Sequence, residues 1–406
     1  MAPRLTIADV ARTAGVSASA VSFAFNGRPG VSAATRLRIL RTADELGWAP
    51  SSGARALASD HADAVGLVIT RAPLLLSADP FFPAFIAGIE SELEHRGYAL
   101  LLQVAGDPAS EAERYRQLAR RGRVDGVFLT DLRITDDRVP LLMELGLPAV
   151  TLGRPAQPSP FPAVVLDDRV GVALAVDHLV DLGHTRVALV NGPRDYLHVR
   201  NRRDAWARAL AARGVPRGPA VTADFTAAGG AAATRRLLAR PDRPTAIVYT
   251  NDVMAIAGIG AAAEHGLRVP EDLSVTGYDD IELAGAVRPP LTTVRGDPVA
   301  WGRRATVALL HAIDRRASES PGAVTGPPGR GPADGLPVDP PPDDELPPAS
   351  LVVRRSTAPP LPRIHRRISG WWCAVSVQMP SELGRCVVRR TYRTERRGHL
   401  TGASIS

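Results

Sequence analysis

The 406-residue sequence contains no lysine and only two cysteines, Cys373 and Cys386. Two cysteines without histidines at metal-ligand spacing do not make a zinc site, and we expect simple thiols rather than a structural disulfide. No stretch reaches the roughly 18 uncharged apolar residues of a membrane-spanning helix, and the N-terminus lacks the apolar core of a signal peptide. These absences favour a cytoplasmic globular protein, whose length allows two or three domains.

Motifs of catalysis are also missing. The sequence has no G-x-S-x-G elbow, no Walker-type phosphate loop and no metal-ligand spacing. His178 and His184 flank one turn, "HLVDLGH", where packing or capping explains them better than chemistry. We therefore expect neither an enzyme nor a bound cofactor or metal.

The net charge of +7 is concentrated at one end of the chain. From Arg363 onward, nine arginines accompany only two acidic residues, Glu382 and Glu395, so the rest is close to neutral. This basic extension, residues 357–406, could bind phosphates non-specifically or pack on the preceding domain. It follows an insertion, about residues 320–348, in which ten of 29 residues are proline. We therefore expect the extension to be disordered.

Three short helices are expected within residues 1–49. Thr6 followed by Asp9 has the spacing of a capping box, Gly15 ends the first helix, and Ser17 and Ser32 cap the next two. The residues expected on the apolar face of the third helix are Leu37, Leu40, Ala43 and Leu46. Two helices joined by a tight turn are typical of a helix-turn-helix, although any small helical hairpin shares that spacing.

A strand–helix rhythm begins near residue 64. The apolar runs typical of buried strands are AVGLVIT, YALLLQV, VDGVFLT, LPAVTLG, PAVVLDD, TRVALVNG, PAVTADF, TAIVYTND and LSVTGYDD, with a last strand in SLVVRR. Alternation of this length predicts an α/β fold with parallel, doubly wound sheets. A Pro-rich connection divides the runs into two groups, which indicates two similar lobes. Ligands of such folds bind beyond the carboxyl ends of the strands, so we expect a site in the cleft between the lobes.

Several motifs in order resemble the lactose-repressor (LacI/GalR) family of bacterial transcription regulators. They include TIADVARTAGVSASAVSFAFNG, SSGARALAS, HLVDLGHTRVALVNGP, TAIVYTNDVMAIAGI and GLRVPEDLSVTGYDD, and the resemblance covers roughly residues 5–356. It implies an all-α helix-turn-helix headpiece at 1–49 and a hinge helix at 50–60. It further implies a two-lobed effector and dimerisation domain at 61–356, similar to periplasmic binding proteins.

The resemblance places small side chains at the DNA. Ala18 and Ser19 occupy the positions that face base edges, where alanine can touch a thymine methyl and serine can hydrogen-bond to several bases. Phe23 stands where the family usually has arginine, and either packs in the headpiece or touches bases. Leu57 falls on the family's minor-groove leucine, an apolar wedge that bends the duplex. The complete set of implied DNA contacts is Thr6, Ser17, Ala18, Ser19, Ser22, Asn26, Arg55 and Leu57.

The resemblance also implies five effector contacts. They are Phe81, Phe82, Arg202, Phe225 and Asp252. Aromatic faces suit the apolar face of a sugar, and arginine and aspartate suit its hydroxyls. Ala205 replaces the glycine of the family pattern that contains Arg202. The structural alternatives are core packing for Phe81, a surface ion pair for Arg202 and a helix N-cap for Asp252.

Together these features predict a homodimeric, effector-responsive regulator that binds a palindromic double-stranded operator. The simplest form is a repressor of carbohydrate-utilisation genes. The alternatives are an activator that responds to a purine or another metabolite, a periplasmic-type sugar-binding protein, and a metabolic enzyme on a doubly wound fold. The headpiece argues against a periplasmic protein, and the missing catalytic residues argue against an enzyme.

Overall fold

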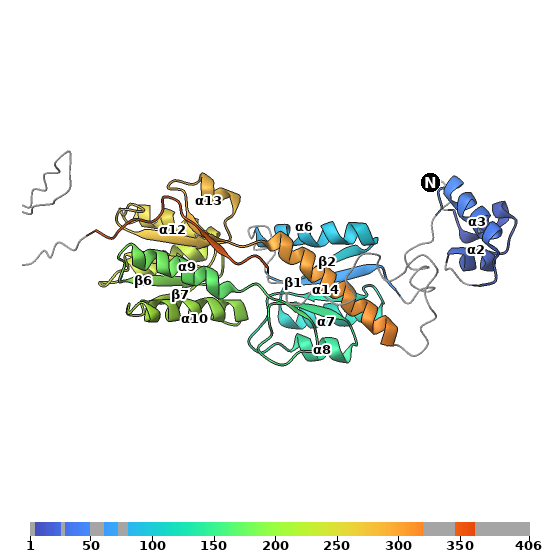
Figure 1. Ribbon diagram of the computed structural model, residues 1–406, viewed down its shortest axis with the longest axis horizontal. Helices are drawn as coiled ribbons and strands as arrows, with labels where there is room; N and C mark the ends of the chain where they lie inside the picture. The colour runs from blue at the N-terminus through green and yellow to red at the C-terminus, as the bar shows by residue number, and fades with distance from the viewer. Residues whose placement is uncertain (1–4, 26–28, 49–60, 72–79, 320–345, 362–406) are drawn as a thin grey trace, which may run out of the picture. The chain divides into compact units, whose positions relative to one another are not determined.

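The computed structural model describes residues 5–25, 29–48, 61–71, 80–319 and 346–361 (Figure 1). Its described parts are a group of N-terminal helices, here called the headpiece, and two α/β lobes. The expected hinge helix, Asn26 and most of the Pro-rich insertion lie outside the described residues, as does the extension from residue 362 onward.

Three helices form the headpiece. They are α1 (Ile7–Ala14), α2 (Ala18–Phe25) and α3 (Ala33–Glu45). The Asp9 carboxylate accepts a hydrogen bond from the Thr6 backbone N–H at 2.9 Å, and Gly15 ends α1 in the left-handed region at φ 64°. The hydroxyls of Ser17 and Ser32 accept from the backbone N–H three residues on, at 3.1 and 3.2 Å. The three helices and their caps are therefore confirmed.

The buried face of α3 differs from the expected one. Leu37 is 64% exposed and Leu40 is 42% exposed, whereas Ile39 is fully buried. The residues that point inward or are partly buried follow the i, i+3, i+4, i+7 spacing of one helix face: Ile39, Thr42, Ala43 and Leu46. Our assignment of Leu37 and Leu40 to the buried face is wrong, because a threonine in the true face interrupts its apolar pattern.

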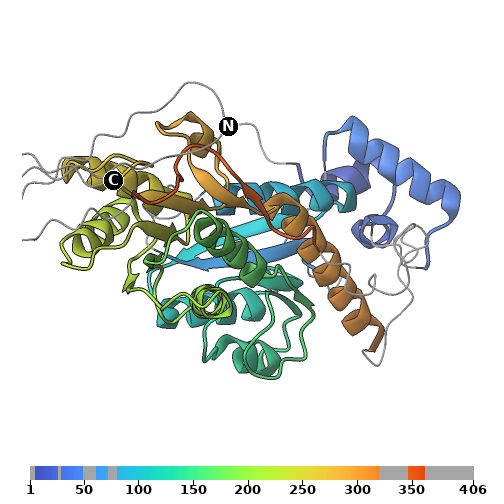
Figure 2. The same ribbon diagram turned by 60° about the vertical axis from the view of Figure 1, so that its left-hand side comes forward.

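Each lobe contains one mainly parallel sheet (Figures 1 and 2). The first lobe has the order β2-β1-β3-β4-β5, all parallel. Its strands are β1 (Ala64–Thr70), β2 (Ala99–Ala105), β3 (Gly126–Leu129), β4 (Ala149–Leu152) and β5 (Ala163–Val164). The second has the order β11-β10-β9-β8-β6-β7, in which only the β10–β11 pair is antiparallel. Its strands are β6 (Val187–Asn191), β7 (Ala220–Thr222), β8 (Ala246–Tyr249), β9 (Ser274–Tyr278), β10 (Thr292–Arg295) and β11 (Ser350–Val352).

Helices cover both faces of each sheet. The first lobe has α6 (Phe81–Leu93), the 3-10 turn η1 (Glu94–Arg96), α7 (Pro108–Arg120), α8 (Arg138–Glu144) and α14 (Pro298–Glu319). The second has α9 (Asp168–Asp181), α10 (Leu197–Ala212), α11 (Ala227–Leu238), α12 (Asp252–Glu264) and α13 (Glu282–Ala286). Along β6, Val187 and Leu189 pack in one core and Ala188 and Val190 in another, as the strand period requires. The two-lobed, doubly wound α/β fold is therefore confirmed.

The chain crosses between the lobes more often than the two sequence runs indicate. After β10 of the second lobe, α14 returns to the first lobe and packs along α6 (Figure 1). The two helices approach so closely that only glycine fits at the contact. A Cβ on Gly88 would lie 2.1 Å from the Val299 carbonyl oxygen, and a Cβ on Gly302 would lie 2.3 Å from the Phe85 carbonyl oxygen. The chain then re-enters the second lobe as β11. None of the described helices is long and apolar enough to span a membrane.

The second lobe continues past β11 as a hydrogen-bonded segment. The Ser356 hydroxyl donates to the Val275 carbonyl oxygen at 2.6 Å, and the Ala358 N–H donates to the Ser274 hydroxyl at 3.0 Å. His184 Nε2 lies 2.9 Å from the Ala358 carbonyl oxygen. The boundary drawn after Ser356 therefore falls inside this segment.

Candidate functional site

The N-terminal end of α2 presents small, neutral side chains. Ser17, Ala18 and Ser19 are exposed, and the two serine hydroxyls lie 2.9 Å apart. Thr6 is also exposed, and Ser22 is half-buried. These residues are accessible to a partner, and contact with DNA stays a prediction. Arg55 and Leu57 lie outside the described residues.

Phe23 is half-buried and lies outside the core cluster of the headpiece. Its ring lies against Gly30, 3.5 Å from where a Cβ of that residue would stand. The aromatic contact of the headpiece is instead made by Phe25 and Trp48, whose ring centroids are 5.3 Å apart. Phe23 therefore covers a turn, and its ring stays partly accessible.

A buried ion pair lies at the carboxyl edge of the first sheet. Arg71 directly follows β1 and Asp131 follows the neighbouring strand β3. The Arg71 guanidinium donates to both Asp131 oxygens at 2.8 Å and lies 5.0 Å from the centre of the Phe82 ring. Sequence reasoning missed both charged residues. Their positions immediately beyond two apolar runs were the signal that pointed to them.

A second buried ion pair lies in the other lobe. Arg202 of α10 donates to Asp168 Oδ1 from Nη2 at 2.7 Å and from Nε at 3.1 Å. It also donates to the Thr250 carbonyl oxygen at 2.7 Å and lies 3.9 Å from the centre of the Tyr278 ring. The side chains of the pair are only 12% and 13% exposed. Arg202 is thus in an ion pair, as our structural alternative held, but in a buried one.

His198 lies within electrostatic reach of both ion pairs. Its ring stacks between those of Tyr196 and Phe225, at centroid distances of 5.5 and 5.8 Å. Burial lowers the pKa of His198 to about 4, helped by the two arginines and opposed by Asp131 and Asp168. The imidazole is therefore neutral at pH 7, and it lies within electrostatic reach of both pairs.

Aromatic side chains of the second lobe complete the site. The Arg71 guanidinium lies 5.3 Å from the centre of the Phe225 ring and 5.8 Å from that of Tyr196. Phe225 is 7% exposed, and its φ of 68° places it in the left-handed region. One cation from the first lobe thus contacts two rings from the second. We use the name cleft cluster for the following residues: Arg71, Asp131, Asp168, Tyr196, His198, Arg202 and Phe225.

The two predicted phenylalanines of α6 differ in their surroundings. Phe82 is fully buried, with Arg71 over its ring. Phe81 is half-buried and stacks on Phe85 at 5.7 Å, with Trp301 packed against its ring. Core packing therefore accounts for Phe81, whereas Phe82 lies next to the cleft cluster.

Asp252 lies inside the second lobe. The N-cap of α12 is Asn251, whose side chain accepts from the Met254 N–H at 2.9 Å, so the N-cap alternative for Asp252 is wrong. Asp252 is fully buried. Its oxygens accept from the Thr293 hydroxyl at 2.5 Å and the Ile281 N–H at 2.9 Å. Burial raises the pKa of Asp252 to about 7 despite these two donors.

Two backbone hydrogen bonds join the lobes beside the cleft cluster. The Leu197 N–H donates to the Leu132 carbonyl oxygen at 2.8 Å, and the Ile134 N–H donates to that of Asp195 at 3.0 Å. The loop after β3 is therefore tied directly to the start of α10, which carries His198 and Arg202.

A buried network of charged side chains binds the loop that follows β3. Glu111 of α7 is fully buried and accepts from Arg133 at 2.5 Å and from Arg138 at 2.8 Å. Arg138 also pairs with Asp136 at 2.7 Å and donates to the Asp131 carbonyl oxygen at 3.1 Å. The network fixes the backbone that carries Asp131. Within the described ranges, no group of three or more histidine, cysteine or acidic residues has the arrangement of a metal site.

Two family descriptions match the chain. Residues 6–51 match bacterial regulatory proteins of the lacI family, and residues 176–329 match a periplasmic binding protein-like domain. The ribose operon repressor of Escherichia coli K12 is 35% identical over 314 residues, which is 76% of this chain and 93% of the repressor. The regulator CelR of Thermobifida fusca is 34% identical, over 78% of this chain and 94% of CelR. The repressor PurR of Photobacterium profundum is 33% identical, over 77% and 93%.

Solved structures show the same architecture. The lac repressor dimer bound to operator and the anti-inducer ONPF is 28% identical and has a TM-score of 0.71. That match covers 88% of this chain and all of the repressor. A CelR–cellobiose complex is 31% identical with a TM-score of 0.60, and covers 87% of this chain. With its capped helix-turn-helix and its two lobes, each built on a mainly parallel sheet, this chain belongs to the lacI family of bacterial regulatory proteins.

Proposed function

We propose that the protein is a homodimeric transcriptional repressor that binds a palindromic operator through its headpiece and responds to a neutral sugar. The relatives support this, because they include a ribose operon repressor and a CelR solved with cellobiose. The lac repressor was solved as a dimer bound to operator. The observation that carries the effector class is the pairing of charges in the cleft cluster.

Each arginine of the cleft cluster already has a carboxylate. Arg71 is paired with Asp131 and Arg202 with Asp168, so the four charges sum to zero. An anionic ligand would meet two carboxylates, and a cationic one would meet two guanidinium groups. A polyol instead donates to carboxylate oxygens and accepts from guanidinium N–H groups, and it leaves both pairs intact. The nearby rings suit the apolar face of a sugar.

A purine is the second candidate. The relatives include PurR repressors, and the stacked rings of Tyr196, His198 and Phe225 offer flat surfaces. The two ion pairs favour the sugar, because a planar base has few hydroxyls with which to satisfy them.

Asp252 acts in this proposal as a positioning residue rather than a direct contact. It binds the Ile281 N–H and thereby holds the turn of Asp279 and Asp280, both of which have positive φ. Asp279 in turn stabilises the charge of Arg202. Asp252 therefore acts on the ligand through the turn beside Arg202.

Calorimetry with neutral mono- and disaccharides, sugar phosphates and purines tests the effector class. Anisotropy of a labelled palindromic operator tests DNA binding and its response. We expect a neutral sugar to bind and to weaken operator binding in the wild type. Arg202→Met should abolish the sugar response and leave operator affinity unchanged, because the headpiece is untouched. Arg208→Met on the exposed side of the same helix is the matched control. Binding of a purine but no sugar would overturn the effector class, and absence of operator binding would overturn the repressor.

A further inference from the structure

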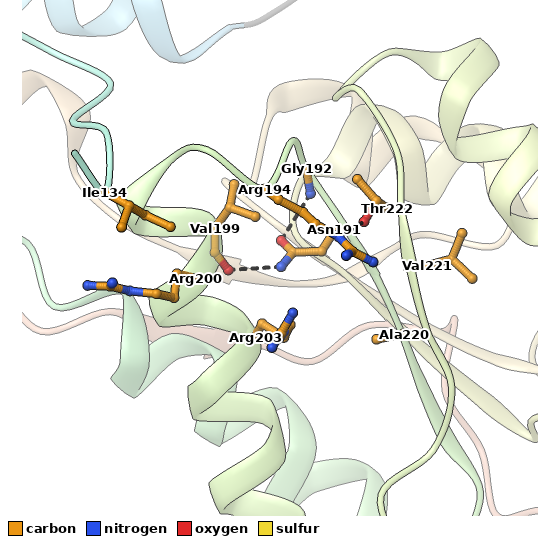
Figure 3. Close-up of a pocket in the computed structure, with 10 residues that line it drawn as sticks. All are labelled: Ile134, Asn191, Gly192, Arg194, Val199, Arg200, Arg203, Ala220, Val221 and Thr222. Atoms are coloured by element: carbon orange, nitrogen blue, oxygen red, sulfur yellow. Dashed lines mark hydrogen bonds between the residues drawn. The ribbon is translucent and has the colours of Figure 1, made fainter. Parts of the chain in front are cut away.

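A cavity lies in the second lobe, outside the cleft cluster. It has a volume of about 250 Å³ and opens where β6 and β7 end and α10 begins (Figure 3). This is below the roughly 300–1,000 Å³ of sites for drug-sized ligands, so its occupant is a small molecule. None of the residues of the cleft cluster lines it.

The lining of this cavity is cationic. It contains Arg194 and Arg203, which lie beside Asn191, and Arg200, whose side chain extends away from Asn191 on the side of Ile134 (Figure 3). None of the ten lining residues has a carboxylate. This contrasts with the cleft cluster, in which each arginine has an acidic partner. The positive charges of Arg194 and Arg203 beside one small cavity repel each other, and an anion would relieve that repulsion.

Two of these arginines have no partner for their side chains among the described residues. Arg194 donates to the Thr222 hydroxyl at 3.1 Å, whereas Arg200 and Arg203 make no side-chain hydrogen bond or ion pair with a described residue. Their guanidinium N–H groups are therefore available for a ligand. A guanidinium binds phosphate oxygens through paired hydrogen bonds, which makes phosphate the anion that three arginines suit best.

The rest of the lining is apolar. Val199, Val221, Ala220 and Ile134 provide carbon surface next to the arginines. Ile134 belongs to the first lobe and is tied by its N–H to Asp195 of the second, so an occupant would contact both lobes beside their junction. We propose that this cavity binds a small phosphorylated metabolite, of the size of a monosaccharide phosphate, as a second ligand separate from the effector.

Calorimetry at constant ionic strength tests the site with inorganic phosphate, glucose 6-phosphate and glucose as probes. We expect saturable binding of phosphate, and tighter binding of the sugar phosphate because it also covers apolar surface. Glucose should compete with neither at this cavity. Arg203→Gln should weaken phosphate binding about tenfold, the loss of one charged hydrogen bond. Because Arg203 is exposed and has no partner, the fold should be unaffected, and a melting curve checks this.

Two matched variants make the result decisive. Arg208→Gln removes an exposed arginine of the same helix that does not line the cavity, and should leave phosphate affinity unchanged. Arg202→Met disrupts the cleft cluster and should also leave it unchanged, which separates this site from the effector site. The proposal is overturned if millimolar phosphate gives no saturable binding. It is equally overturned if Arg203→Gln and Arg208→Gln have the same effect, or if only Arg202→Met abolishes binding. None of these results depends on the effector class or on operator binding.

Discussion

The two lobes share one parallel α/β plan but bury different polar groups. The first lobe buries charges: Glu111 between two arginines, Asp136 with Arg138, and Arg71 with Asp131. Besides its Arg202–Asp168 pair, the second lobe pairs the buried Asp280 with Arg354 and Arg295, and it also satisfies several buried polar atoms with uncharged groups. His184 bonds to the Thr245 hydroxyl and the Ala358 carbonyl oxygen, and the Thr234 hydroxyl to that of Tyr249. Similar folds can therefore satisfy buried polar atoms by ion pairing or by neutral hydrogen bonds.

The presence or absence of an arginine partner gives individual buried carboxylates opposite responses to pH. Burial alone would raise the pKa values of Asp131 and Asp136, but their arginine partners hold both below the usual range. These two carboxylates stabilise the fold above the unfolded-state value of about 4, and that contribution is lost as the pH falls through their folded values. Asp252 has no arginine partner, and burial raises its pKa to about 7. It stabilises the fold fully only at low pH, and that contribution is lost as the pH rises toward 7.

The largest effect is expected at the centre of the charge network. Glu111→Gln would leave Arg133 and Arg138 without their shared carboxylate, and should lower the free energy of unfolding by about 3–5 kcal/mol. Urea denaturation measures this. The matched control is Glu113→Gln on the same helix, which removes only half-exposed pairs and should cost at most about 1 kcal/mol. Equal losses in the two variants would show that the network does not depend on Glu111.

A smaller effect is expected at the neutral network of the second lobe. His184→Ala would leave the Thr245 and Ser274 hydroxyls and the Ala358 carbonyl oxygen without their shared partner. We expect a loss of about 2–3 kcal/mol, less than for Glu111, because no charge is stranded. His265→Ala, at an exposed position, should change stability by less than about 0.5 kcal/mol. A loss at His184 larger than that at Glu111 would reverse the comparison.

The smallest expected effect is a change in how the free energy of unfolding depends on pH. In Asp252→Asn the carboxyl group that loses its contribution as pH rises is gone. The stability of the variant relative to wild type should therefore improve by about 2 kcal/mol between pH 5 and pH 8. Thermal or urea unfolding across that range measures it. Asp136→Asn, whose native pKa is lowered, should show no such improvement there. A pH-independent difference for Asp252→Asn would mean that its carboxyl group titrates at the ordinary value.

Much of the architecture was predictable because it depends on neighbours in sequence. The capped headpiece helices follow from Thr6, Ser17 and Ser32, whose capping partners, the Asp9 carboxylate and two backbone N–H groups, lie within three residues. The strands follow from apolar runs bounded by turns, and the location of the Arg71–Asp131 pair follows from where the parallel strands β1 and β3 end. The resemblance to the family, rather than their spacing, points to Phe82, Arg202 and Phe225 as effector contacts. Their contact with a ligand is still a prediction.

Other features depend on residues far apart in the chain. Arg71 and Asp131 are 60 positions apart, and Glu111 and Arg138 are 27 apart, so no local pattern pairs them. The return of α14 to the first lobe and the burial of Asp252 are likewise decided by packing against distant segments. The local sequence pattern of this protein is enough to predict its helices and strands, its family and the sheet edge at which the cleft cluster lies. Which charges are neutralised in pairs, and which arginines lack a side-chain partner among the described residues, follows from the folded arrangement, because ion pairing depends on distances that folding establishes.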